Sequence, residues 1–101
     1  MTGERYEEEL RELLLSEPET IQRSVIDVAV ERITQPDHGW TMTHDDEHGY
    51  GHLIRLAKDR LERAYTMGDM GADEQARVQL VKAAALAVAG IDVIDRAAGR
   101  V

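Results

Sequence analysis

Residues 73–98, DEQARVQLVKAAALAVAGIDVIDRAA, form the stretch that decides the fold. Alanine and leucine recur throughout it, and both are among the strongest helix formers. Between Leu80 and Ile94 the predicted helix is apolar nearly all round, with Lys82 and Asp92 as the exceptions. A helix without a polar face lies either at the centre of a bundle or in a subunit interface. We therefore expect one long helix here, covered by other helices.

The same stretch predicts self-association. Small residues at Ala83, Ala87 and Gly90 form a strip that allows another helix backbone to approach closely. The helix also carries more apolar surface than three short helices can comfortably cover. We therefore expect a homodimer or higher oligomer, with an interface formed by Ala83, Ala87, Gly90 and Ile94.

A second helix is predicted between Thr43 and Gly68. Residues 43–46, THDD, are a typical helix-start signal, in which a threonine cap is followed three residues later by an acid. Gly49 and Gly51 each weaken a helix by about 1 kcal/mol relative to alanine, so we expect this helix to be broken near these two glycines. Its apolar stripe consists of Leu53, Ala57, Leu61, Ala64 and Tyr65.

Two further helices are predicted nearer the N-terminus, at about residues 4–15 and from just after Ser16, with Pro18 in its first turn, to about Thr34. The sequence SEPE at 16–19 is a capping box, and Pro36 stops the later helix. Their apolar stripes are Tyr6, Leu10, Leu13 and Leu14 in the first helix, and Ile21, Val25, Val28, Ala29 and Ile33 in the second. The chain is therefore predicted to be all-α, a compact bundle of about four helices in a single domain spanning residues 1–101.

The composition excludes several classes of function. The chain of 101 residues has no cysteine, which excludes a disulfide scaffold, a cysteine-ligated zinc site and thiol catalysis. The longest apolar run, 83–91, has nine residues, whereas a membrane span needs about 20. The polar N-terminus, MTGERYEEEL, lacks the apolar region of a signal peptide. We expect a cytoplasmic protein that makes no membrane contact.

The charge is concentrated in the first half of the chain. Of the formal net charge of −8, residues 1–50 carry 13 acids against four arginines. An acidic surface disfavours nucleic acid as a ligand, because phosphate contacts need basic groups. It suits either a basic partner protein or simple solubility.

The residues that suggest chemistry are clustered in one segment. Residues 38–52, HGWTMTHDDEHGYGH, contain all four histidines and two of the four aromatic residues. If the segment is helical, successive histidines at 44, 48 and 52 lie on one face, where two imidazoles and a carboxylate can ligate a divalent metal. The candidate metal ligands are His44 and His48. The candidate binding residues are Trp40, His44, Asp45, Asp46, His48 and Tyr50.

A structural interpretation explains the same residues without a cofactor. Thr43 caps the helix, the acids complement its dipole, the imidazoles bond locally, and Trp40 is buried at the end of the bundle. We favour this interpretation and expect no catalytic residue and no cofactor, with a divalent metal as the alternative. A third pattern pairs the acids at 8, 9 and 12 with Asp92 and Asp95, a spacing that can hold Mg²⁺.

Two blocks of the sequence resemble a known family. They are G-W-T-x-x-H-D-D-x-H-x-x-G at 39–51 and R-x-x-L-V-K-A-A-A-L-x-x-A-x-I-x-x-x-D-R at 77–96. Over about residues 31–98 the chain is similar to small uncharacterised helical proteins of bacteriophages and prophages. The family often has a longer insert between its last two helices and an acid where this chain has Gly90. The resemblance implies a phage or prophage origin and an intracellular site of action, and it implies no activity.

The all-α layout is also similar to that of MazG-type pyrophosphohydrolases, although their acidic pairs lie on two central helices. Our prediction is a self-associating binding protein that presents an acidic surface to a host or defence protein. The alternative is a metal-assisted protein that binds or hydrolyses nucleotides through the His44–His48 segment. A purely structural accessory protein is the third possibility.

Overall fold

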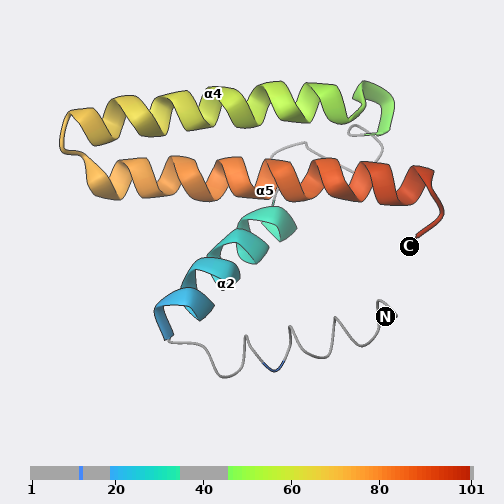
Figure 1. Cartoon of the computed structure of the whole chain (residues 1–101), viewed down its shortest axis with the longest axis horizontal. Coiled ribbons are helices and arrows are strands. Elements are labelled where there is room, and N and C mark those ends of the chain that lie inside the picture. Colours follow the sequence, from blue (N-terminus) through green and yellow to red (C-terminus); the bar gives the residue numbers. More distant parts are fainter. Residues whose placement is uncertain (1–11, 13–18, 35–45, 101) are drawn as a thin grey trace.

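The computed structural model describes residues 12, 19–34 and 46–100. In these ranges the chain forms three α-helices and no strand: α2 (Glu19–Thr34), α4 (Tyr50–Asp69) and α5 (Asp73–Ala97) (Figure 1). The all-α prediction is confirmed, and α5 ends within one residue of the predicted boundary. The predicted helix at 4–15, apart from Glu12, and the SEP part of the capping box at 16–18 lie outside the described residues.

The helices α4 and α5 form an antiparallel hairpin (Figure 1). Only residues 70–72 connect them, and Gly71 takes a φ of 75°, a backbone conformation that favours glycine. The Gly71 N–H donates to the Gly68 carbonyl at 3.0 Å, and the Ala72 N–H donates to the Met67 carbonyl at 2.8 Å. These two bonds occupy carbonyls at the end of α4, so the chain reverses tightly into α5.

A small apolar core fills the space between α4 and α5. Leu53 of α4 packs with Leu86, Ala89 and Val93 of α5, and Leu56 and Ala57 lie against this cluster. Leu53 is 1% exposed and Ala89 is fully buried. Since alanine projects little beyond the backbone, the α5 alanines let the two helices pack closely.

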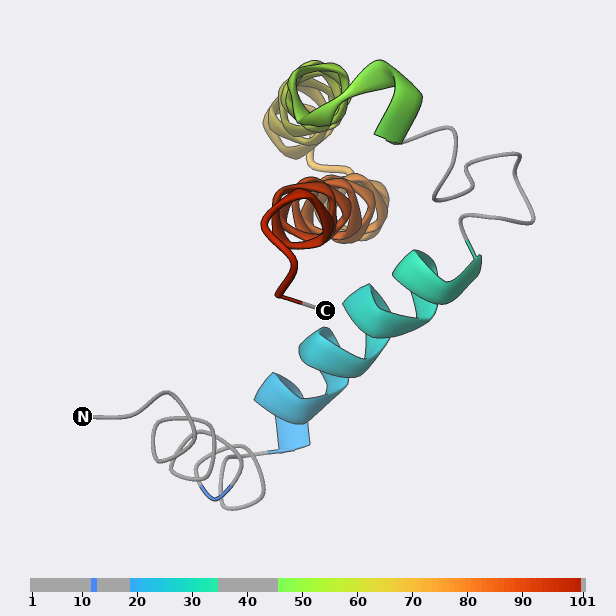
Figure 2. The same cartoon turned by 90° about the vertical axis from the view of Figure 1, so that its right-hand side faces the viewer.

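Helix α2 lies on the other side of α5 from α4, so that α5 is the central helix (Figure 2). We expected this helix, which is apolar nearly all round, either at the centre of a bundle or in a subunit interface. The central position is confirmed. Three ion pairs join α2 to α5. They are Asp27–Arg77 at 2.7 Å, Glu31–Lys82 at 3.3 Å and Arg32–Asp92 at 3.0 Å.

The orientation of α2 is the main departure from expectation. An apolar stripe normally faces the core, yet Val25 is 47% exposed and Ile33 is 74% exposed. Ala29 is also exposed and Val28 is half-buried, while nothing is described for the side chain of Ile21. The physical reason is that α5 presents charged side chains to α2. The half-buried residues of α2 include Asp27, Glu31 and Arg32, which pair with those side chains, and Val28, which lies among them.

The predicted break before α4 is confirmed at Gly49. Residues 46–48 form a separate helical turn, and Gly49 then takes φ 77° and ψ 166° before α4 begins at Tyr50. A positive φ costs other residues energy, which accounts for glycine here. Gly51 instead lies in the first turn of α4, with an ordinary helical backbone.

Candidate functional site

The structure places half of the candidate binding residues. Asp46, His48 and Tyr50 are described, whereas Trp40, His44 and Asp45 lie outside the described residues. The three described residues lie on either side of Gly49, where the separate helical turn meets α4. Their contacts therefore decide what this segment does.

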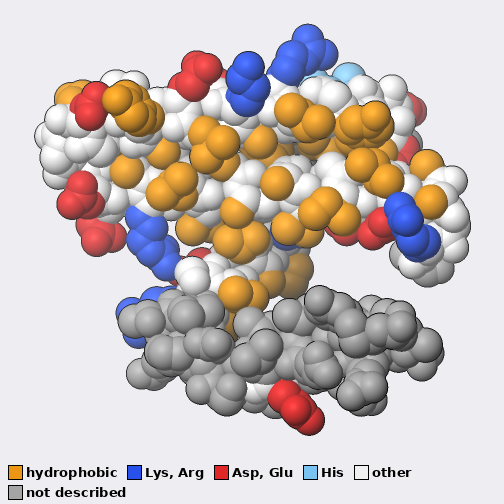
Figure 3. Space-filling view, viewed as in Figure 1, with side chains coloured by type: hydrophobic (Ala, Val, Ile, Leu, Met, Phe, Trp, Pro, Cys, Tyr) orange, Lys and Arg blue, Asp and Glu red, His pale blue; other side chains and the backbone are white. Residues whose placement is uncertain are grey.

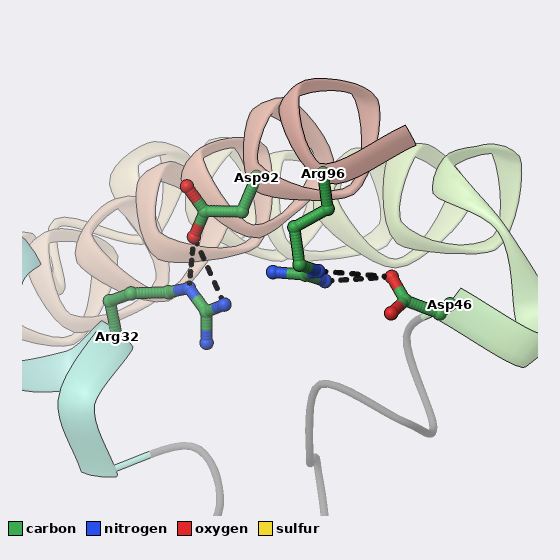
Figure 4. Close-up of polar contacts among 4 residues, drawn as sticks. All are labelled: Arg32, Asp46, Asp92 and Arg96. Atoms are coloured by element: carbon green, nitrogen blue, oxygen red, sulfur yellow. Dashed lines mark hydrogen bonds and ion pairs between the residues drawn. The ribbon is translucent and has the colours of Figure 1, made fainter. Parts of the chain in front are cut away.

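Asp46 is held by an arginine from the end of α5. Arg96 donates from Nη2 to Asp46 Oδ1 at 2.8 Å and from Nε to the same oxygen at 3.2 Å (Figure 4). Arg96 is 21% exposed and Asp46 is 49% exposed, so this contact lies at the surface. Next to it, Arg32 holds Asp92 in the same way. Asp46 thus fastens the helical turn at 46–48 to the last turns of α5.

The two aspartates of the D-x-x-D pattern are also engaged by arginines. Asp92 pairs with Arg32, and Asp95 pairs with Arg100 at 3.1 Å. Of the acids at 8, 9 and 12 that were proposed as their partners around Mg²⁺, those at 8 and 9 lie outside the described residues and Glu12 is exposed. In the structure, Asp92 joins α5 to α2, and Asp95 makes a local contact at the C-terminal end of α5.

The histidines at 48 and 52 come together across the Gly49 break. Their ring centroids lie 5.1 Å apart with the planes tilted by 36°. The predicted pairing of His44 with His48 involves a residue outside the described part of the chain. Among the described residues, no group of three or more His, Cys, Asp or Glu side chains is arranged to hold a metal ion.

The four predicted interface residues divide into two pairs. Ala83 is 4% exposed and Gly90 is buried, both within this single chain. A Cβ built on Gly90 would lie 4.0 Å from the Cβ of Tyr50, so Gly90 faces the start of α4. Ala87 is exposed and Ile94 is 42% exposed, so these two residues are accessible to a partner.

Large apolar side chains are more often exposed than buried in the described residues. Only Leu53, Leu86 and Val93 are buried among the residues larger than alanine, while 14 large hydrophobic residues are at least 37% exposed. Several of these exposed residues form one surface on the hairpin of α4 and α5, which we call the hairpin face. Ala87 lies at its centre and is counted with it. The hairpin face consists of Tyr50, Ile54, Leu61 and Tyr65 of α4 and Leu80, Ala87, Ile91 and Ile94 of α5.

A second exposed apolar surface runs along α2. We call it the α2 ridge, and it consists of Val25, Ile26, Val30 and Ile33. The sequence predicted part of both surfaces as helical stripes of α2 and α4, and it predicted Ala87 and Ile94 of α5 as interface residues. The sequence does indicate an exposed apolar surface on α4. This helix carries two apolar stripes, one at 53, 56, 57 and 64 and another at 50, 54, 61 and 65, and only one of the two can face α5.

An open groove of about 240 Å³ lies between α2 and α5. Its charged groups already pair with each other across the groove, as Asp27 with Arg77 and Glu31 with Lys82. We therefore interpret the groove as the seam of the α2–α5 contact. It is lined by Asp27, Val30, Glu31, Arg77, Val78, Val81 and Lys82.

The excess of acidic residues is largely outside the described helices. Residues 19–34 and 46–100 contain 12 acids and 10 bases, whereas the whole chain has 20 and 12. The predicted acidic surface therefore depends on residues that the structure does not describe. In the described ranges, no helix has both the length and the apolar character that a bilayer crossing requires.

Comparison with protein-family models finds no match, and the comparisons with curated proteins and with solved structures find none either.

Proposed function

We propose that this protein is a small helical binding protein that works as an assembly of its own copies and contacts a partner protein. One observation carries the proposal. In the described residues, 14 large hydrophobic side chains are exposed and three are buried. Monomeric proteins rarely expose large continuous apolar patches, and such patches usually mark contacts with other proteins.

The size of the core supports the same proposal. Each Å² of apolar surface removed from water contributes roughly 25 cal/mol, and chains of this size bury a smaller fraction of their surface than larger domains do. A hairpin whose core contains only Leu53, Leu86 and Val93 as large buried residues gains little from its own packing. Association that covers the exposed leucines and isoleucines would add the missing burial.

The partner is proposed to be a host or defence protein, reached through the acidic N-terminal part of the chain. The support for this is the surplus of 13 acids over four arginines in residues 1–50, which suits a basic protein surface. A phage or prophage origin is part of the same proposal and depends on the G-W-T…H-D-D-x-H and L-V-K-A-A-A-L blocks.

A metal-assisted nucleotide-binding protein is the second candidate. It is favoured by the proximity of His48 and His52, whose ring centroids are 5.1 Å apart. Two imidazoles at this separation can share one divalent transition-metal ion when a further ligand completes the site. The metal titration described in the Discussion separates this candidate from the first.

Light scattering coupled to size-exclusion chromatography tests self-association. The monomer has a mass of 11.3 kDa. We expect a mass of at least twice this value at micromolar concentration, falling toward the monomer mass on dilution. A protein that stays at the monomer mass at high concentration would refute the proposal.

A further inference from the structure

We infer that two copies of this chain pack hairpin face against hairpin face and so complete a four-helix bundle. The inference rests on the proposed self-association and names the surface that performs it. The alternative surface is the α2 ridge, which is also apolar and exposed.

Two contacts fix how α4 and α5 lie against each other. Tyr50 lies beside Gly90, and Arg60 Nη1 donates to Gln79 Oε1 at 3.0 Å. Leu61 directly follows Arg60 on α4, and Leu80 directly follows Gln79 on α5. In two antiparallel right-handed helices, these single steps rotate away from the contact line toward the same side. The stripes containing Leu61 and Leu80 therefore form one continuous surface.

The stripes follow helical spacing along both helices. On α5, positions 80, 87, 91 and 94 recur at i, i+7, i+11 and i+14, and on α4, positions 50, 54, 61 and 65 recur at i, i+4, i+11 and i+15. Of the α5 residues that pair with α2, Asp92 falls on the far side of the helix from this stripe, whereas Arg77 borders the stripe, three residues before Leu80. Figure 3 shows hydrophobic side chains gathered over both α4 and α5 on the face toward the viewer.

The area of the hairpin face suits a specific dimer. A helix of 20 residues is about 30 Å long, and two helices packed side by side are about 20 Å wide, which gives roughly 600 Å² per copy. Two copies would then bury about 1,200 Å², which exceeds the roughly 1,000 Å² of a specific interface. The α2 ridge, one helix of 16 residues, offers about 240 Å² per copy by the same reasoning and falls short.

The eight apolar residues of the hairpin face present no charge of their own to a second copy. A two-fold interface brings each surface against itself, so any charge in its centre meets its own sign. None of the eight residues of the hairpin face is charged, and the exposed Lys58, four residues after Ile54 and three before Leu61, borders the α4 stripe. Ala87 occupies the middle of the α5 stripe, and its small side chain leaves room for a helix of the second copy.

The test compares one substitution on each apolar surface. Ile91→Glu places a charge on the hairpin face at a residue that is 57% exposed, and Ile33→Glu places one on the α2 ridge at a residue that is 74% exposed. We expect Ile91→Glu to weaken dimerisation at least 100-fold by concentration-dependent light scattering. We expect Ile33→Glu to change it less than threefold, with both variants retaining the wild-type circular dichroism spectrum.

The outcomes separate the inference from the proposed function. A wild-type protein that is monomeric overturns both. A wild-type dimer that persists in Ile91→Glu, or that dissociates only in Ile33→Glu, overturns the hairpin face alone and leaves self-association intact.

A thiol-protection experiment decides the question if Ile91→Glu fails to fold. The chain has no cysteine, so a single introduced thiol reports on its own position. We expect Ala87→Cys to react at least tenfold more slowly with a thiol reagent in concentrated than in dilute protein. Val30→Cys, on the α2 ridge, is expected to react at the same rate in both. Equal rates for Ala87→Cys would overturn the inference.

Discussion

Arg32 of α2 and Asp92 of α5, 60 residues apart in the chain, form an ion pair in which Nε and Nη2 approach the same carboxylate oxygen at 3.1 and 3.0 Å. The Arg32 side chain is 16% exposed, so this pair is shielded more than a typical surface ion pair. It joins the C-terminal end of α2 to the central helix, in the region where Arg96 also holds Asp46. Polar contacts of this kind therefore position α2, whose apolar side faces outward.

Replacing Arg32 is expected to cost more than replacing an exposed arginine. Hydrogen bonds to charged groups contribute about 1.5–3 kcal/mol when they are shielded, so Arg32→Ala should lower the free energy of unfolding by about 1–2 kcal/mol. Arg63, which pairs with Asp59 at 3.1 Å and is 53% exposed, is the matched control. Arg63→Ala should change stability by less than about 0.5 kcal/mol. Urea denaturation of both variants measures the difference, and equal losses would contradict it.

Leu53 is expected to be the most sensitive position in the core. It is 1% exposed and lies against Leu86, Ala89 and Val93. Truncation of such a residue leaves a cavity, and Leu53→Ala should cost about 2–5 kcal/mol. Leu61→Ala, at a residue that is 49% exposed, is the control and should affect dimerisation more than the unfolding of the dilute protein. Thermal and urea unfolding at low protein concentration test this contrast.

The same chemical change should have opposite effects at two neighbouring glycines. Gly49 has a φ of 77°, which alanine adopts only at a cost, so Gly49→Ala should destabilise the protein by about 1–2 kcal/mol. Gly51 is helical, and Gly51→Ala should stabilise it by up to about 1 kcal/mol. A Cβ at either position meets no atom within 4 Å, so neither effect is masked by a clash. Two changes of the same sign would argue against the break at Gly49.

Added zinc or nickel is expected to leave the melting temperature unchanged, because we interpret the histidine segment as structural. If the segment instead binds metal, a concentration of 100 times the dissociation constant should stabilise the fold by about 2.7 kcal/mol. His48→Ala should then abolish the gain, and His52→Ala should do the same, since the two rings lie side by side. A metal-dependent rise in melting temperature that both variants lose would establish the second candidate function.

Trp40 remains a prediction from the sequence, because it lies outside the described residues. We expect it to be buried at the end of the bundle, with Trp40→Ala costing about 3–5 kcal/mol. As the only tryptophan in the chain, it can be followed by its fluorescence alone. A red-shifted and readily quenched emission from the native protein would show that it is exposed.

The features predicted well from the sequence are those that local chemistry controls. The end of α2 at Thr34, the extent of α5 and the break at Gly49 depend on proline, glycine and helix-forming residues close by in the chain. The environment of α2 could not be predicted in this way. A helix with one apolar and one charged side can dock by either, and Arg77, Lys82 and Asp92 of α5 decide which.

In the candidate site, too, the local features were predicted from the sequence and the long-range contacts were not. The crowding of histidines and acids identified the segment at 38–52, and His48 and His52 lie near each other although the helix is broken between them at Gly49. The pairing of Asp46 with Arg96, 50 residues away, depends on the path of the whole chain. Local spacing contains no information about such a distant partner.

The three-residue connection between α4 and α5 has a consequence for how the chain folds. The core residues that pack across this hairpin, Leu53 with Leu86, Ala89 and Val93, are 33 to 40 residues apart, and their contact forms in a first-order step within one chain. Pairing of two copies requires a diffusional encounter and is second order. Refolding should therefore show a fast phase that is independent of concentration, as the hairpin closes. A slower phase should follow, whose rate rises in proportion to protein concentration.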